Sequence, residues 1–298
     1  MADYGQALPD SKIRKELIRR IIFHQANLLS VGTKVVETVE LDTLGVKFDY
    51  PSEMTATYPV GDTAVAKRET IKWSEFKADL EKAQVHYMIT DSAKLRNLSG
   101  TQQSIMARRA GEALATSKDN EILGVLHGGA GSSVAASGLW SSVSTDIEAD
   151  IIKAWNSILT ESNVRTEELQ RLGVTLIVPV AAFANLNKLT LIGNVQQTIS
   201  TYLKTAYGVN ILPTRTAELG TSSSTDALMF VPGGMTAQHA VLGARAAAAA
   251  GVPLVERERI TGSGDDYLIT QWYKTVVIED GSASGQTDRI VKITNVTS

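Results

Sequence analysis

The 298-residue chain contains no cysteine and only seven prolines. Without cysteine it forms no disulfide, no thiolate metal site and no cysteine nucleophile. It also lacks any run of about 18 uncharged apolar residues, which a transmembrane helix requires, and its N-terminus lacks the basic-then-apolar order of a signal peptide. A formal net charge of −3 argues against a dedicated duplex-DNA binder, which would be markedly basic. We expect a protein that stays inside the cell that makes it and has no membrane segment.

Sequence patterns of catalysis are missing as well. His127-Gly128-Gly129 is typical of an esterase oxyanion loop, but residues 281–285 place alanine where the serine of a Gly-x-Ser-x-Gly motif would stand. No Gly-Lys pair exists for a phosphate loop. The four histidines are scattered and form no H-E-x-x-H pattern of a zinc site. We therefore expect no catalytic residue, no cofactor and no metal, and predict that the chain is not an enzyme.

Residues 12–30 are predicted to form an amphipathic helix. Apolar residues recur along it at helical spacing: Ile13, Leu17, Ile18, Ile21, Ile22 and Leu28. The opposite face is predicted to be basic, with Lys12, Arg14, Lys15, Arg19 and Arg20. This basic face is either solvated or directed at an acidic partner, such as nucleic acid or a neighbouring acidic subunit.

Residues 33–75 are predicted to form a long two-stranded hairpin. Residues 46–50, 63–67 and 71–73 alternate between apolar and polar side chains, and residues 58–62 form a strong turn signal between them. An isolated two-stranded ribbon is at best marginally stable in water. Another part of the protein, or another chain, is therefore expected to hold this hairpin in place.

The next clear element is a long helix over residues 100–127, about 42 Å in length at ~1.5 Å per residue. Its polar middle, residues 116–121, argues against an unbroken helix. The glycines at 128 and 129 are expected to supply a left-handed residue that ends it. A Gly/Ser/Ala-rich loop is predicted to follow over residues 130–144.

The remaining chain mixes helical and strand patterns. We predict helices over 146–162, 180–189 and 193–207, and a small-residue helix or loop over 237–251. Strands are predicted at 84–90, 173–179, 209–212, 227–231, 267–272, 276–279 and 290–293. No internal repeat and no clear linker divides the chain. The expected class is α+β, with two lobes interleaved in the sequence.

The order of these elements resembles that of the major capsid proteins of tailed phages and related archaeal viruses, the Hong Kong 97-like fold. The closest local likenesses are residues 109–124, 173–179 and 267–280, and the resemblance covers nearly the whole chain. It implies four parts. These are an N-terminal arm (1–32), an extended loop (33–75), a peripheral domain (76–145 and 255–298, with a spine helix over 100–127) and an axial domain (146–254).

The resemblance implies a viral major capsid protein that assembles into an icosahedral shell around double-stranded DNA, found in the virion and assembled in the host cytoplasm. It implies that the chain binds itself in hexamers and pentamers. A separate scaffold, a portal and a decoration protein are further expected partners, and packaged DNA is expected to make weak, non-specific contacts. The extended loop then supplies the assembly-interface candidates Tyr58, Lys67, Arg68 and Trp73, and the five basic residues of the first helix face the interior.

Two other functions remain open from the sequence. An encapsulin-like shell has the same fold but encloses an enzyme cargo instead of DNA. A soluble α/β enzyme would assemble its site from residues that lie far apart in the sequence. Self-assembly distinguishes both shells from the enzyme.

Overall fold

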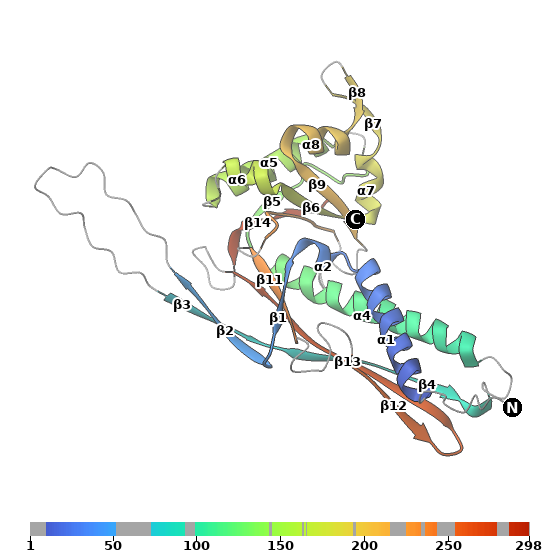
Figure 1. The fold of residues 1–298 in the computed structure, drawn as a ribbon. Coiled ribbons are helices and arrows are strands. Elements are labelled where there is room, and N and C mark those ends of the chain that lie inside the picture. Colours follow the sequence, from blue (N-terminus) through green and yellow to red (C-terminus); the bar gives the residue numbers. More distant parts are fainter. Residues whose placement is uncertain are drawn as a thin grey trace, which may run out of the picture.

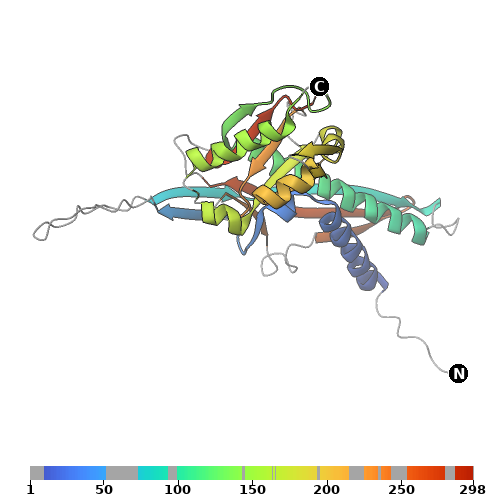
Figure 2. The ribbon, with the colours of Figure 1, turned by 90° about the horizontal axis from the view of Figure 1, so that it is seen from above.

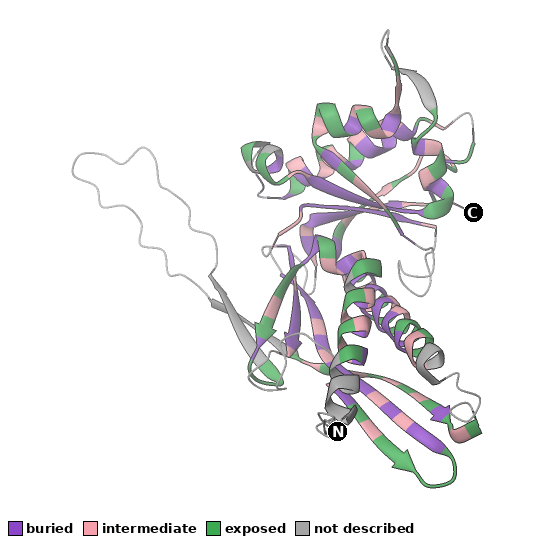
Figure 3. Ribbon diagram, turned by 45° about the vertical axis from the view of Figure 1, so that its right-hand side comes forward, coloured by how far each residue is buried: buried purple, intermediate pink, exposed green. Residues whose placement is uncertain are grey.

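The computed structural model describes residues 10–51, 73–92, 99–142, 145–162, 164, 166–192, 195–214, 225–233, 236–242, 254–278 and 286–297. Two five-stranded sheets form the centres of two lobes, one above the other in Figure 1, and a two-stranded ribbon projects to one side. The predicted α+β class is confirmed. Figure 3 shows that buried residues concentrate along the strands of both sheets and on one long helix.

The first sheet is built around one long strand. Its order is β1-β11-β13-β12, and β4 pairs with the remaining edge of β13. The bounds are β1 (Glu37–Leu41), β4 (Glu81–Thr90), β11 (Ala237–Leu242), β12 (Leu254–Ile260) and β13 (Gly264–Val277). The two strands predicted at 267–272 and 276–279 are thus one strand, because β13 pairs first with β12 and then with β11.

Helix α4 (Ser99–Gly128) lies along this sheet and is the long helix predicted over 100–127. Helix α1 (Asp10–Leu29) packs against α4 through Ile18, Ile22 and Ala26, all buried. Glycine at position 111 allows the two helices to approach, because a Cβ there would lie 2.9 Å from the carbonyl oxygen of Ile22. A substitution at this position would push α1 away from α4.

The polar middle of α4 does not interrupt the helix, because its buried carboxylate has partners elsewhere. Asp119 accepts hydrogen bonds from Ser30 Oγ at 2.6 Å, from Val31 N at 3.0 Å and from Gly32 N at 2.8 Å. These residues connect α1 to the short helix α2 (Gly32–Val35). Asp119 therefore holds the end of α1 on the middle of α4.

The second sheet has the order β5-β14-β10-β6-β9. Its strands are β5 (Ala130–Ala135), β6 (Val174–Pro179), β9 (Val209–Thr214), β10 (Ala227–Phe230) and β14 (Thr287–Thr294). Around it lie α5 (Ile147–Glu161), α6 (Thr166–Leu172), α7 (Val180–Leu186), α8 (Ile199–Tyr207) and the small hairpin of β7 (Leu189–Ile192) and β8 (Val195–Thr198). Every residue of β6 is buried, as its continuous apolar sequence predicts.

The two faces of this sheet are covered by different elements. On one face, Leu176, Met229 and Val291 belong to a core that includes the buried residues of α5. On the other, Ile177 and Leu228 share a core with the last turns of α4. The alternation along each strand thus places the second sheet between α5 and α4.

The ribbon consists of β2 (Gly45–Pro51) and β3 (Trp73–Asp79), paired antiparallel from Gly45 opposite Asp79 to Pro51 opposite Trp73. Hairpin pairing is therefore confirmed for these residues. The second strand, β3, continues to residue 79, past the predicted end of the hairpin at 75. Residues 37–41, which were expected in the hairpin, form β1 and pair parallel with β11. The predicted turn at 58–62 lies outside the described residues.

Three predictions of local structure are wrong. Residues 130–135 are not a loop but β5, whose small residues have little strand preference and are held by parallel pairing with β14. Residues 195–198 are not helical, because they pair with β7. Residues 237–242 are β11, held between β1 and β13, rather than a helix or loop.

The end of α4 also differs from the prediction. Neither Gly128 nor Gly129 has a positive φ, so no left-handed residue ends the helix there. Gly129 instead allows a close approach, since a Cβ at this position would lie 2.6 Å from Val277 Cγ2. The chain then enters β5 directly at Ala130.

The strand pairing also differs from the expected division of the chain. β5 and β14, expected in the peripheral part, are in the second sheet, whereas β1 and β11, expected in the loop and the axial part, are in the first. The physical reason is that both sheets are completed by strands distant in sequence, which composition and spacing do not reveal.

We predict that Asp119→Ala lowers the free energy of unfolding by about 3 kcal/mol, because it leaves two backbone N–H groups and a hydroxyl without their acceptor. Asn120→Ala, at the exposed neighbouring position, is the matched control and should change it by less than about 0.5 kcal/mol. Urea unfolding measures both. Equal effects of the two variants would contradict the anchoring role of Asp119.

Candidate assembly surfaces

The side chains of the four loop residues predicted at the assembly interface lie outside the described part of the structure. Tyr58, Lys67 and Arg68 lie outside the described residues, and Trp73 is the first residue of β3, opposite Pro51, with its side chain not described. The assembly interface on this loop therefore stays a prediction. What the structure adds is the base of the loop, the ribbon of β2 and β3, which points away from both lobes (Figure 2).

The basic face predicted for the first helix is only partly described. Lys12, Arg14 and Lys15 lie in the first turns of α1, but their side chains are outside the described part. Arg20 is exposed and Arg19 is half-buried. Arg19 is therefore not fully solvated, unlike Arg20.

The apolar face of α1 is narrower than predicted. Leu17 and Leu28 are 58% and 59% exposed, whereas Ile18 and Ile22 are buried. Leu17 and Leu28 are eleven positions apart, about three helical turns, so they lie on one side of α1. The apolar spacing predicts both leucines on the apolar face of the helix together with Ile18 and Ile22. At about 100° per residue, Leu17 and Leu28 instead lie about a quarter turn from Ile18, on the side away from Ile22 and Ala26.

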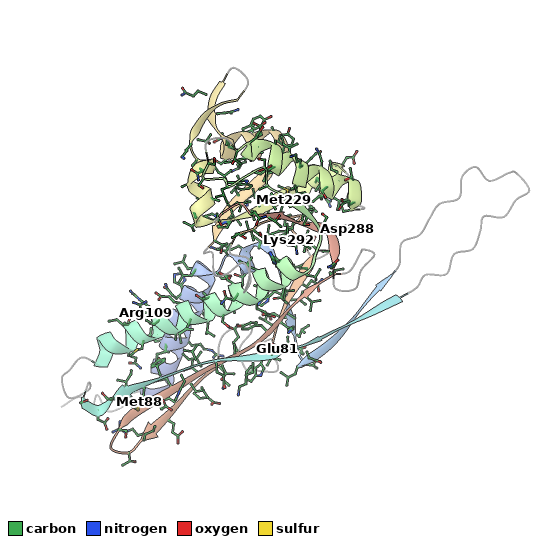
Figure 4. All side chains as sticks on the ribbon, turned by 180° about the vertical axis from the view of Figure 1, so that it is seen from behind. Glu81, Met88, Arg109, Met229, Asp288 and Lys292 are labelled. Carbon is green, nitrogen blue, oxygen red and sulfur yellow. The ribbon has the colours of Figure 1, made fainter. Side chains whose placement is uncertain are left out.

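A cleft of about 470 Å³ lies between the end of α1, the middle of α4 and the second lobe. Leu29, Val180 and Pro213 contribute apolar walls, and Arg109 pairs with Glu112 across 3.1 Å at its edge. Leu29 and Val180 are also exposed, at 43% and 55%. Figure 4 labels Arg109 on α4, and Glu81 and Met88 toward opposite ends of β4.

His127, the histidine of the His-Gly-Gly motif, has a structural role. Its Nε2 lies 3.0 Å from Asp226 Oδ2, and the other oxygen of Asp226 accepts a hydrogen bond from Asn295 N at 3.2 Å. The pair of His127 and Asp226 connects the end of α4 to the second sheet. A separate ion pair lies across the β12–β13 hairpin, where Arg257 donates to Asp265 at 2.7 Å.

The described residues contain no group of three or more His, Asp or Glu side chains placed to hold a metal ion. None of their helices is both long and apolar enough to cross a membrane. The described structure instead offers two candidate assembly surfaces, the projecting ribbon and the exposed leucines of α1.

The chain was compared with known proteins at three levels. No family model matches it, and no curated protein matches its sequence. Solved structures do match. A chain from Mycobacterium phage Adephagia has a TM-score of 0.63 at 13% identity, covering 89% of each chain. The virus-like particle from Pyrococcus furiosus has a TM-score of 0.61 at 13% identity, covering 93% of this chain and 98% of its own.

A third match is the capsid of Myoviridae phage XM1, with a TM-score of 0.58 at 14% identity, covering 90% of this chain and 92% of its own. These matches extend over nearly the full length of both partners. They confirm the Hong Kong 97-like capsid fold that the resemblance implied.

We predict that Leu17→Ser combined with Leu28→Ser weakens self-association without unfolding the subunit. Both side chains are largely exposed, so the free energy of unfolding should change by less than about 1 kcal/mol, while the concentration needed for self-association rises about tenfold. Light scattering and urea unfolding measure the two quantities.

The control for this pair is Ile22→Ser, which removes a fully buried side chain of the same helix and should cost about 3 kcal/mol of stability. An unchanged association threshold in the double leucine variant would show that this side of α1 makes no contact.

Proposed function

We propose that the chain is a viral major capsid protein that assembles into an icosahedral shell around double-stranded DNA. The observation that carries the proposal is the match over about 90% of the chain to virus and capsid structures, each of which is itself covered to 89% or more. The likeness is therefore not limited to a common substructure.

The ribbon of β2 and β3 supports self-assembly on independent physical grounds. Two antiparallel strands without a third are marginal in water, and this pair forms a sheet of its own in the described chain. A neighbouring copy would cover it and supply the missing contacts. We place the interface candidates Tyr58, Lys67, Arg68 and Trp73 in this contact.

The proposed parts follow the sequence interpretation with the strand pairing corrected. We take residues 1–32 as the arm and the segment between β2 and β3, with both strands, as the extended loop. The first sheet with α4 is the peripheral domain, and the second sheet with α5 to α8 is the axial domain. The proposed assembly is of hexamers and pentamers in the virion, formed in the host cytoplasm.

Other partners belong to the same proposal. A separate scaffold, a portal and a decoration protein are expected, and the basic residues of α1 would face packaged DNA. The net charge of −3 suits a shell that encloses DNA without binding it tightly, since affinity for phosphates rises with each basic contact. An encapsulin-like shell around an enzyme cargo is not favoured, and no described group of residues supports an enzyme.

Negative-stain electron microscopy of the purified full chain tests the proposal. We expect rings, sheets or closed shells that appear above a threshold concentration. A compact monomer or dimer at every concentration and salt tested would overturn it.

A second prediction tests the loop. Replacing residues 56–67 by the two-residue turn Asn-Gly should leave a folded subunit, because both strands of the ribbon and both five-stranded sheets lie outside the replaced segment, and should abolish shells. Circular dichroism and microscopy measure the two effects.

As a control, the same length of Gly and Ser residues at 56–67 keeps the loop size and should also fail to assemble if side chains such as Tyr58 and Lys67 make the contact. Shells formed by the shortened chain would refute the loop assignment.

A further inference from the structure

A group of polar and titratable side chains lies between α4 and the first sheet; four of its six members are buried, one is half-buried and Ser117 is exposed. We call Ser117, Lys118, Glu121, His239, Tyr273 and Thr275 the polar seam. Ser117, Lys118 and Glu121 come from α4, His239 comes from β11, and Tyr273 and Thr275 come from β13. Apolar side chains of α4 flank it, since Leu114, Ile122 and Leu126 are fully buried. The seam therefore interrupts a hydrophobic interface.

His239 is one of two seam residues, with Glu121, that have a buried polar atom without a hydrogen-bond partner among the described residues. Its side chain is only 1% exposed, and its Nδ1 lies 2.9 Å from Thr275 Oγ1. Its Nε2 is buried and has no hydrogen-bond partner among the described residues. Burial lowers the pKa of His239 to about 3, with the positive charge of Lys118 as the second cause. The imidazole is therefore neutral in the closed structure at any ordinary pH.

Lys118 places a cation on the same aromatic ring as His239. Its Nζ lies 6.0 Å from the centre of the Tyr273 ring, and the His239 ring lies 5.5 Å from that ring. The side chain of Lys118 is 5% exposed, and burial lowers its pKa to about 8 although Asp119 acts in the opposite direction. At neutral pH the seam thus already holds one buried ammonium.

The other charged groups of α4 and β13 around the seam each have a partner of their own. Asp119 is bonded to the α1–α2 connection. Glu121 accepts Thr275 N at 2.6 Å, and burial raises the pKa of its carboxyl. Lys274 of β13 pairs with Glu81 of β4. From β1, the residue in register with His239 is Thr38, which carries no charge.

The seam adjoins a pocket of about 220 Å³, lined by Glu81, Lys82, Ala83, Ser117, Glu121 and Tyr273. Glu81, Lys82 and Ser117 are exposed, so the pocket opens to solvent. Tyr273 and Ser117 bridge it through hydroxyl oxygens 2.7 Å apart. Water can enter the seam from this pocket when the elements on its two sides separate.

We propose that the polar seam is a proton-operated joint: protonation of His239 beside Lys118 drives α4 away from β11 and β13, into an open conformation in which both groups are hydrated. The joint has a mechanical consequence, because α1 and the second lobe are attached to α4 through Asp119 and His127. Movement at the seam carries them with it. The inference concerns a single subunit and does not depend on shell formation.

The sign of the effect follows from linkage. In the open conformation His239 has its ordinary pKa of about 6.5 and takes up a proton as the pH falls, whereas in the closed one it stays neutral down to a pH of about 3. The closed structure therefore loses stability as the pH falls through this window. Between pH 7 and pH 5 the population of the open conformation should rise about 25-fold.

Hydrogen–deuterium exchange of the full chain at pH 7 and pH 5, corrected for the intrinsic exchange rates, measures this population. We expect residues 113–126 and 237–242 to lose about 25-fold of their protection at pH 5, while α5 in the second lobe does not change. His239→Gln provides an amide able to bond Thr275 but takes up no proton, so the protection of its seam should change little between pH 7 and pH 5. His86→Gln replaces an exposed histidine of the same sheet and should respond like the unaltered chain.

Lys118→Met provides a second, nearly isosteric variant should His239→Gln not fold. Removing the buried ammonium should increase protection of the seam at pH 7. The response to pH should stay near 25-fold, because burial, the larger cause of the low pKa of His239, still keeps the closed imidazole neutral. Seam protection that is equal at the two pH values, or a full response in His239→Gln, would overturn the proposal. Unchanged protection at pH 7 in Lys118→Met would overturn the role of Lys118. Because exchange is read on the subunit, loss of the response with intact shells refutes the joint and leaves the proposed function standing.

Discussion

The packing of α4 against both sheets is the constraint on which the rest of the structure depends. Ile122, Leu123 and Leu126 form one core with Ala237 and Val277 of the first sheet and with Ile177 and Leu228 of the second. Neither sheet covers these side chains alone. The position of each lobe is therefore set by the same turns of one helix, which explains why the chain needs no rigid linker between them.

The two ends of α4 then use different interactions. Toward its start, α1 packs in through buried aliphatic side chains and the close approach at Gly111. At its end, the histidine–carboxylate pair of His127 and Asp226 reaches the second sheet, and Gly129 brings β5 against Val277. Apolar contact fixes how far the elements lie apart, and the few buried polar contacts fix their register along the helix.

Periodic elements were predictable from the sequence and pairing partners were not. The helices α4 and α5 and the strand β6 follow from apolar spacing or continuous apolar runs. β5 and β11 do not, because Ala130–Ala135 has little intrinsic strand preference and both strands are defined by partners far along the chain. The polar middle of α4 suggested a break for the same reason: the donors to Asp119 lie 87 to 89 positions away. For the candidate assembly surfaces, the sequence predicted the hairpin. It assigned Leu17 and Leu28 to the apolar face of α1, and their exposure in the structure was not predicted.

The central place of β14 in the second sheet has a consequence for biosynthesis. This strand lies between β5 and β10 and pairs with both, yet it follows both of them in the chain. Until residues 287–294 emerge from the ribosome, β5 has no partner in its sheet and the edge of β10 that pairs with β14 is unpaired. The second lobe therefore cannot form completely before β14 is synthesised. Any surface that this lobe presents to a neighbouring copy is finished only at that point.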